Sequence, residues 1–316
     1  MKVIFLGTPE FAVPSLEAAA KAGHEVQLVI TQPDRPKGRK GQPQPPPVKI
    51  AAQALRIPVR QPQSVNDADT VDALYQLKPD VVAVAAFGQI LRRKVIEAPR
   101  IACINVHASL VPKYRGAAPI PAAILNGDEL TGVTIQRMVR KLDAGDIIRQ
   151  ASTPIGADET AGELTERLAY IGAKLLVEAL ADLEAGRARF LAQEESMATF
   201  APMLDKNDGR ITWSDTAAGI ARRVRAMTPW PGTFSFLRRE KNVLRVNIGK
   251  ATAAPAGPQS GQPGEVIAVE RDHFAVKAAD AAVLVQRLQP AGKQMMSAAE
   301  FIRGYRLKTG DRFAEG

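Results

Sequence analysis

Asn105 and His107 stand two positions apart at the end of an apolar run, residues 101–106, and could act together on one reacting group. On a strand, such residues point the same way, about 6.6 Å apart along it. Ligands of open α/β sheets bind beyond the carboxyl ends of the strands. An amide and an imidazole are therefore expected to converge on one small group there. The alternative is that His107 has only a structural role.

A carboxylate follows at Asp143, in the sequence Leu-Asp-Ala-Gly-Asp of residues 142–146. An ordinary turn aspartate, favoured for its bonds to nearby backbone, is the other interpretation. Between the histidine and this turn lies a loop rich in Gly and Pro that carries Arg115. Cys103 is on the same strand face as His107, but the rise of a strand puts the two residues about 13 Å apart. This distance excludes a directly bonded Cys–His catalytic pair. We expect a buried strand thiol.

Several other chemistries lack their residues. The sequence after the first apolar run is G-T-P-E-F-A, not G-x-G-x-x-G, so a dinucleotide site is not expected. A P-loop is missing from the sequence as well. His24, His107 and His273 are far apart and show no zinc spacing, so no metal is expected.

The elements that must position these residues alternate between strand and helix. An apolar run at 2–6, an amphipathic segment ending at Gly23 and a second run at 26–30 give β-α-β spacing. Further strands are predicted at 80–85 and 101–106, and further helices at 48–55, at 67–77 and from Thr160 to Gly186. This pattern predicts an α/β fold with a doubly wound, mostly parallel, Rossmann-like sheet.

The carboxyl-terminal part has a different pattern. After a helical segment at 215–226, short β-type runs recur with turn residues between them, at 233–237, 243–248, 264–269, 273–277 and 282–288. These runs predict a small, OB-like β-barrel. We expect a catalytic domain at 1–188, a linker at 189–207 and a barrel domain at 208–316.

The net charge of the 316 residues is +9, and the carboxyl-terminal third carries most of it. Residues 205–316 hold 18 Lys or Arg and 11 Asp or Glu. This excess suggests a polyanionic partner such as nucleic acid, with a generally basic surface as the alternative. One cysteine excludes an intramolecular disulfide. With neither a long apolar span nor a secretory signal in the sequence, we expect a cytoplasmic protein without membrane attachment.

Residues 32–49 contain six prolines and five basic residues. Pro and Gly at this density predict a long surface loop without helix or sheet. Such loops are either functional or simply solvated.

Six motifs resemble one known family and span nearly the whole chain. They are F-L-G-T-P-E-F-A (5–12), T-Q-P-D-R-P-x-G-R (31–39), I-N-V-H-A-S-L-V-P-K-Y-R-G-A-A-P-I (104–120), L-D-A-G-D (142–146), P-W-P (229–231) and L-Q-P-A-G-K-Q-M-M-S-A (288–298). The chain resembles the folate-dependent formyltransferases, and the second and last motifs point to their tRNA-directed branch. Val111 stands where the family more often has Leu, a conservative change.

The resemblance implies an enzyme that moves formyl from 10-formyltetrahydrofolate to the α-amine of methionyl initiator tRNA, for translation initiation. Asn105 would donate to the tetrahedral oxyanion, protonated His107 would stabilise it, and Asp143 would favour imidazolium and help relay the proton. The folate would lie in a cleft formed by Phe87, Gly88, Gln89, Ile90, Leu91, Ser109, Leu110, Val111 and Pro112. Ordinary core positions are the alternative for Phe87, Ile90 and Leu91.

The basic loop would enter the acceptor end of the tRNA, with Arg39 carrying most of the contact alongside Arg35, Lys37 and Lys40. The barrel domain would contact the phosphates of the tRNA, and we expect Arg222, Arg223 and Arg225 to make these contacts. A solvated basic helix face also explains these three. We expect a monomer. The alternatives are a formyltransferase acting on glycinamide ribonucleotide or an amino-sugar nucleotide, and a tRNA-binding protein without catalysis.

Overall fold

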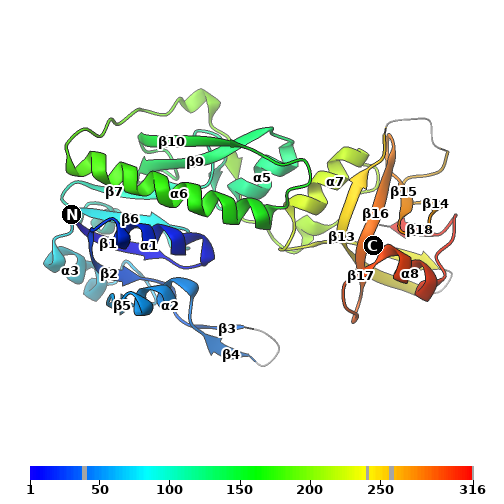
Figure 1. Cartoon of the computed structure of the whole chain (residues 1–316), viewed down its shortest axis with the longest axis horizontal. Coiled ribbons are helices and arrows are strands. Elements are labelled where there is room, and N and C mark those ends of the chain that lie inside the picture. The colour runs from blue at the N-terminus through cyan, green and yellow to red at the C-terminus, as the bar shows by residue number, and fades with distance from the viewer. Residues whose placement is uncertain (38–40, 240–241, 256–259, 315–316) are drawn as a thin grey trace. The chain divides into compact units, whose positions relative to one another are not determined.

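The chain forms two compact units, each assembled from segments that are separated in sequence (Figure 1). The computed structural model describes residues 1–37, 41–239, 242–255 and 260–314. Unit 1 comprises Met1–Pro119, Glu129–Pro154 and Glu163–Pro202. Unit 2 comprises Ile120–Asp128, Ile155–Gly162 and Met203–Gly316. Residues 189–202, at the start of the predicted linker, therefore belong to unit 1.

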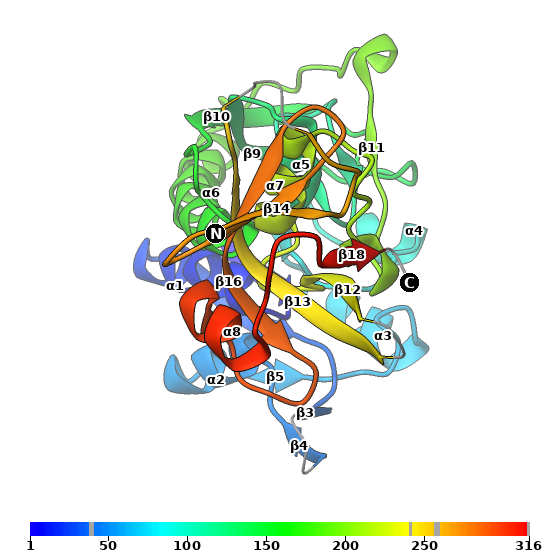
Figure 2. The same ribbon diagram turned by 90° about the vertical axis from the view of Figure 1, so that its right-hand side faces the viewer.

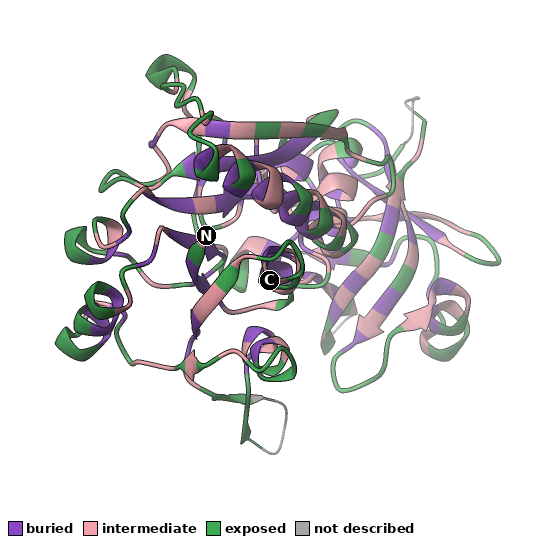
Figure 3. Cartoon of the chain, turned by 60° about the vertical axis from the view of Figure 1, so that its left-hand side comes forward, coloured by how far each residue is buried: buried purple, intermediate pink, exposed green. Residues whose placement is uncertain are grey.

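A seven-stranded sheet forms the centre of unit 1, in the order β10-β9-β7-β6-β1-β2-β5. The parallel strands are β1 (Lys2–Gly7), β2 (Glu25–Ile30), β5 (Val59–Arg60), β6 (Val81–Ala85) and β7 (Ala102–His107). β1, β6 and β7 are buried along most of their length, β2 is buried over its second half, and the edge strand β5 is not buried (Figure 3). The four longer strands confirm the predicted doubly wound core, whereas β5 was not predicted. Two antiparallel strands, β9 (Leu130–Arg137) and β10 (Ile147–Pro154), extend the sheet beyond β7 and were not predicted.

Helices cover both faces of this sheet. On one face, α3 (Ala68–Leu77) and α4 (Arg93–Ile96) pack in a core cluster that includes Cys103 of β7. On the other, α6 (Ala161–Glu184) approaches β7 closely, because a Cβ added at Gly172 would lie 2.8 Å from Val106 Cγ1. The remaining helices of unit 1 are η1 (Glu10–Ala12), α1 (Val13–Lys21), α2 (Pro47–Ala54) and η2 (Glu195–Met197). The described part of the chain holds no helix that is long and apolar enough to cross a bilayer.

The proline-rich segment is not the irregular loop that the sequence predicted. Its strands β3 (Arg35–Lys37) and β4 (Gln42–Gln44) form an antiparallel hairpin. Pro36 and Pro43 lie opposite each other in this hairpin. A two-stranded ribbon has open edges, where a residue without an N–H is tolerated. The prediction was wrong because it applied the rule for central strands.

Unit 2 is built on an antiparallel sheet that curls into the predicted barrel (Figure 2). Its order is β14-β15-β16-β13-β12-β18, with β17 paired to β16. Backbone hydrogen bonds close it between β14 and β18, where Val266 N donates to Asp311 O at 2.8 Å and Phe313 N to Gly264 O at 2.7 Å. The strands of this sheet are β12 (Thr233–Arg239), β13 (Asn242–Ala253), β14 (Val266–Val269), β15 (Phe274–Lys277), β16 (Ala282–Pro290), β17 (Met296–Ser297) and β18 (Arg312–Ala314). In unit 1, β8 (Arg115–Gly116) and β11 (Phe200–Ala201) form a separate two-stranded sheet.

An aromatic core fills the barrel. The Phe274 ring stacks on Phe301 of α8 (Ala298–Tyr305) and on Phe313, with centroid distances of 6.2 and 5.8 Å. The helices α5 (Pro119–Asn126) and α7 (Ala217–Ala226) and the short η3 (Asn207–Gly209) complete the elements. Thr216 caps α7 by accepting from Gly219 N at 3.1 Å.

Candidate functional site

The end of β7 brings Asn105 and His107 onto one face of the sheet, as predicted. The register pairs Asn105 with Gln136 and His107 with Thr134, both on β9. Cys103 is on the same face further back, and its burial raises the pKa of the thiol to about 12. Among the described residues, none hydrogen-bonds the side-chain amide of Asn105. This amide is therefore available to a ligand.

Both ring nitrogens of His107 face oxygen atoms. Nε2 lies 3.0 Å from Tyr114 O, a carbonyl that can only accept, so Nε2 carries a proton. Nδ1 lies 3.8 Å from Asp143 Oδ2. That separation exceeds a hydrogen bond, and an approach of about 1 Å would form one. Because the ring is 5% exposed, this pairing takes place largely out of water.

Two neutral donors hold the carboxylate of Asp143. Gly116 N donates to Oδ2 and Gln136 Nε2 to Oδ1, both at 2.9 Å. The turn that carries Asp143 folds tightly onto β9, because a Cβ added at Gly145 would lie 1.7 Å from Arg137 O. The glycine of the Leu-Asp-Ala-Gly-Asp motif is thus required by close backbone approach. Asp143 itself has a φ of 45°, in the left-handed region.

The segment from Ser109 to Pro112 lies next to His107 and is anchored by backbone contacts. Thr134 Oγ1 donates to Ser109 O at 2.6 Å, and Gln150 Nε2 donates to Val111 O at 2.8 Å. Ser109 and Val111 are buried, whereas Leu110 and Pro112 are partly exposed. The segment could therefore offer Leu110 and Pro112 to a ligand, and its role in folate binding stays a prediction.

The second predicted folate segment, residues 87–91, divides between core and surface. Phe87 and Leu91 belong to the core cluster of unit 1, and Ile90 is 86% exposed. Gln89 holds the neighbouring backbone by accepting from Val65 N at 2.7 Å. Phe87 and Gly88 line a groove of about 490 Å³ beyond the ends of β1 and β6. The strand order reverses between these two strands, the usual position for a ligand in such sheets.

The predicted RNA-binding residues are placed unevenly. Arg35 is exposed and donates to Gln32 Oε1 at 3.2 Å, and Lys37 ends β3. Arg39 and Lys40 lie outside the described residues. The three arginines of α7 each donate to backbone within unit 2: Arg222 to Leu125 O, Arg223 to Asp208 O and Arg225 to Glu159 O. Burial lowers the pKa of Arg225. These bonds brace the unit, and contact with RNA stays a prediction.

Comparison with known proteins decides the family. A model described as formyl transferase matches residues 1–180. The chain belongs to the formyl transferase family. A second model, the formyl transferase C-terminal domain, matches residues 203–306.

Curated relatives cover the whole chain. The methionyl-tRNA formyltransferase of Moorella thermoacetica is 44% identical over 311 residues, 98% of each chain. That of Geobacter sulfurreducens is 42% identical over 316 residues, 100% of this chain and 97% of its own. Among solved structures, the N-formyltransferase from Helicobacter canadensis, in complex with folinic acid and dTDP-3-aminofucose, has a TM-score of 0.67 at 20% identity. It covers 90% of this chain and 99% of its own. HypX from Aquifex aeolicus, in complex with tetrahydrofolic acid, has a TM-score of 0.63 at 20% identity, over 96% of this chain and 48% of its own.

This formyl transferase has a polar network behind Asp143 that sequence reasoning missed. Gln193 Nε2 lies 3.0 Å from Gln136 Oε1 and 2.8 Å from Asp143 O. Arg115, predicted only as a loop cation, is fully buried and donates to Gln193 Oε1. A glutamine in an irregular segment carries no pattern in the sequence, so no signal pointed to Gln193.

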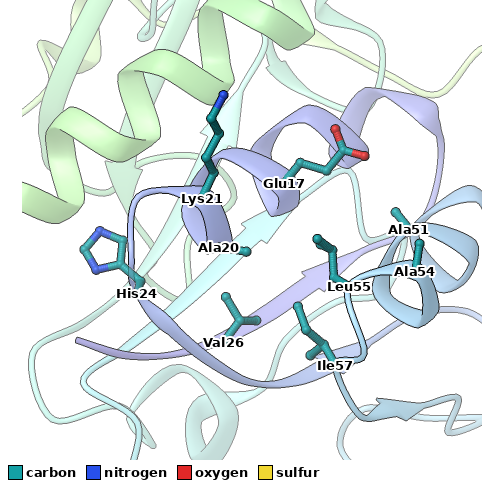
Figure 4. Close-up of a pocket in the computed structure, with 9 residues that line it drawn as sticks. All are labelled: Glu17, Ala20, Lys21, His24, Val26, Ala51, Ala54, Leu55 and Ile57. Atoms are coloured by element: carbon teal, nitrogen blue, oxygen red, sulfur yellow. The ribbon is translucent and has the colours of Figure 1, made fainter.

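This formyl transferase has a second cavity, away from the predicted site. It measures about 620 Å³ and lies between α1, α2 and β2 (Figure 4). Glu17, Lys21 and His24 supply its polar lining. Burial and the neighbouring amino terminus lower the pKa of His24. No residue predicted for catalysis or binding lines this cavity.

Proposed function

We propose that the chain transfers the formyl group of 10-formyltetrahydrofolate to the α-amino group of methionyl initiator tRNA. One observation carries the chemistry: the amide of Asn105, which no described residue hydrogen-bonds, lies on the same strand face as His107, whose Nδ1 faces Asp143. Relatives named methionyl-tRNA formyltransferase, 42–44% identical along the whole chain, support the choice of acceptor. Structural neighbours solved with folinic acid or tetrahydrofolic acid support the choice of donor.

In the proposed reaction, the amine attacks the formyl carbon and a C–N bond forms. The carbonyl oxygen becomes an oxyanion, to which Asn105 donates from its amide and which protonated His107 stabilises. The C–N10 bond of the folate then breaks, and a proton from the attacking amine reaches N10. His107 and Asp143 relay this proton, since a change of about 1 Å joins them. An oxyanion donor contributes about 10²–10³-fold in rate.

The two substrates would meet at the carboxyl edge of the sheet. We place the folate between residues 87–91 and 109–112, because the first segment follows β6 and the second follows β7, which are neighbouring parallel strands. The basic hairpin that contains Arg35 would contact the acceptor end of the tRNA, and the basic unit 2 would contact its phosphates. The cytoplasmic location and the monomeric state stay predictions.

The test is transfer of labelled formyl from 10-formyltetrahydrofolate, with methionyl initiator tRNA, glycinamide ribonucleotide and an amino-sugar nucleotide offered in parallel. We expect labelled tRNA and no labelled small amine. Label on a small amine alone would reject the tRNA assignment and keep the chemistry. RNA binding without any transfer would favour the non-catalytic interpretation.

A matched pair of variants tests the residue roles. His107→Ala should lose at least about 10²-fold in rate. His273→Ala removes a histidine that also faces an aspartate, at 2.8 Å, but on the surface of unit 2. It should keep the wild-type rate. Equal rates for the two variants would reject the proposed role of His107.

A further inference from the structure

A segment that follows α6, residues 191–201, returns to the catalytic half of unit 1. We call this segment the strap. Its Leu191 exchanges backbone hydrogen bonds with Ile147 at 2.8 and 2.9 Å. Thr199 O accepts from Arg115 N at 2.8 Å, and Thr199 Oγ1 accepts from Tyr114 N at 2.9 Å. The strap therefore holds the residue whose carbonyl faces His107.

Gln193 is the strap residue that reaches the catalytic turn. Its Nε2 lies within hydrogen-bonding distance of three oxygens: Gln136 Oε1 at 3.0 Å, Asp143 O at 2.8 Å and Gly145 O at 2.7 Å. Its Oε1 accepts from Arg115 Nε at 3.1 Å and from the same guanidinium's Nη2 at 2.8 Å. Both ends of this one amide are thus used.

Arg115 fixes the orientation of the Gln193 amide. An arginine has donors only, so the oxygen of Gln193 must face it and the amide nitrogen must face the catalytic turn. The guanidinium is fully buried, and Glu195 of the strap supplies its charge partner at 3.0 Å. Lys141 contacts the same carboxylate at 2.7 Å. A buried cation of this kind keeps its partners, since leaving it unpaired is costly.

The Gln193 amide in turn fixes Gln136. Because Gln193 donates to Gln136 Oε1, the amide nitrogen of Gln136 is turned toward Asp143, to which it donates. With the amide of Gln136 reversed, its oxygen would face the carboxylate, and the two acceptors would repel. Gln193 also holds the carbonyl of Asp143, whose left-handed backbone is unfavourable for a residue with a side chain.

We propose that Gln193 is a positioning residue for formyl transfer, holding Asp143 toward His107 through its carbonyl and through Gln136. This inference rests on the proposed function of the site. It assigns a catalytic consequence to a segment that the sequence predicted to be a linker.

The variant Gln193→Glu separates positioning from folding. Glutamate keeps the oxygen that accepts from Arg115 but replaces the donor with a second oxygen, which faces three acceptors. We expect kcat to fall about 10- to 100-fold, the effect of misplacing a catalytic group by about 1 Å. KM for both substrates should change less than about threefold. The pH–rate profile should move to higher pH, because the added negative charge favours the protonated ring of His107. Gln76→Glu, on the exposed face of α3, is the matched control.

The experiment measures formylation of methionyl-tRNA by the full-length wild type, Gln193→Glu and Gln76→Glu across pH, with thermal unfolding of each. A fall in kcat with a displaced pH profile, seen for Gln193→Glu alone, supports the proposal. Equal activity of the two variants overturns it. A fall in kcat with a lower Tm and an unmoved pH profile also overturns it, since that result describes a structural role.

A second readout does not depend on turnover. The chain has three histidines, so histidine-labelled protein gives few ring signals, which histidine-to-alanine variants assign. Gln193→Glu should displace the His107 signals, and Gln76→Glu should not. Unmoved His107 signals overturn the proposal. A wild type that transfers no formyl rejects the proposed function, and the ring signals then decide the positioning role by themselves.

Discussion

Replacing Asp143 with Asn tests how much the carboxylate contributes to catalysis. The substitution removes the negative charge 3.8 Å from His107 Nδ1 and keeps the shape of the side chain. At that distance, a carboxylate and an imidazolium attract by about 1 kcal/mol at the dielectric constant of water and by about 4 kcal/mol at an effective value near 20. The two side chains are 11% and 6% exposed, which favours the upper figure.

Each 1.36 kcal/mol is tenfold in rate, so Asp143→Asn should lower kcat about tenfold to a thousandfold. The assay is initial-rate formylation of methionyl-tRNA at saturating 10-formyltetrahydrofolate. Asp146→Asn is the control, because it removes an equal negative charge from the same turn. Among the described residues, none pairs with the Asp146 carboxylate. Equal kcat values for the two variants would refute the electrostatic argument.

Three further predictions concern stability and reactivity. Hydrogen bonds from Arg115 and Lys141 lower the pKa of Glu195 to about 2, so its ionised form stabilises the fold above about pH 4.5. The Tm difference between wild type and Glu195→Gln should therefore be full at pH 7 and shrink as the pH falls from about 4.5 to 2; a difference constant with pH would contradict this. Burial raises the pKa of the Cys103 thiol to about 12, so a thiol reagent should label the native protein slowly and the unfolded protein rapidly. Equal labelling rates in the two states would contradict its burial. Phe274→Ala should destabilise unit 2 by about 3–5 kcal/mol in chemical unfolding, because the Phe274 side chain is fully buried. Phe190 is 40% exposed, so Phe190→Ala should have a free energy of unfolding close to that of the wild type.

The parallel strands β1, β2, β6 and β7 could be predicted from their apolar runs, whereas the two-residue parallel strand β5 has no such run and was not predicted. The antiparallel strands β9 and β10 could not, since Leu130–Arg137 mixes Thr, Gly and Gln with its apolar residues and Ile147–Pro154 alternates buried and exposed positions. The antiparallel barrel strands, set apart by turn residues, were found near their predicted positions. The sequence pattern therefore identified the central strands of the sheet and most strands of the barrel. It missed both edges of the sheet, β5 on one side and β9 and β10 on the other.

The site divides in the same manner. Asn105 and His107 could be predicted from their spacing at a strand end, and Asp143 from the resemblance of its motif. Gln136 and Gln193 could not, because a buried glutamine is defined by what it touches. Gln193 meets Gln136 across 57 positions and Arg115 across 78, and such contacts arise only after the sheet has formed.

The division of the chain into units has a consequence for the order of synthesis. The boundaries fall at Pro119, Asp128, Pro154, Gly162 and Pro202, so unit 2 includes two segments made long before its barrel. The carbonyls of Leu125 and Glu159 accept hydrogen bonds from arginines of α7 that are synthesised about 60 to 100 residues later. A chain released only to residue 190 therefore lacks both the strap that contacts Asp143 and the arginines that complete unit 2. Both units therefore become complete late in synthesis, because unit 1 needs residues up to Pro202 and unit 2 needs its barrel.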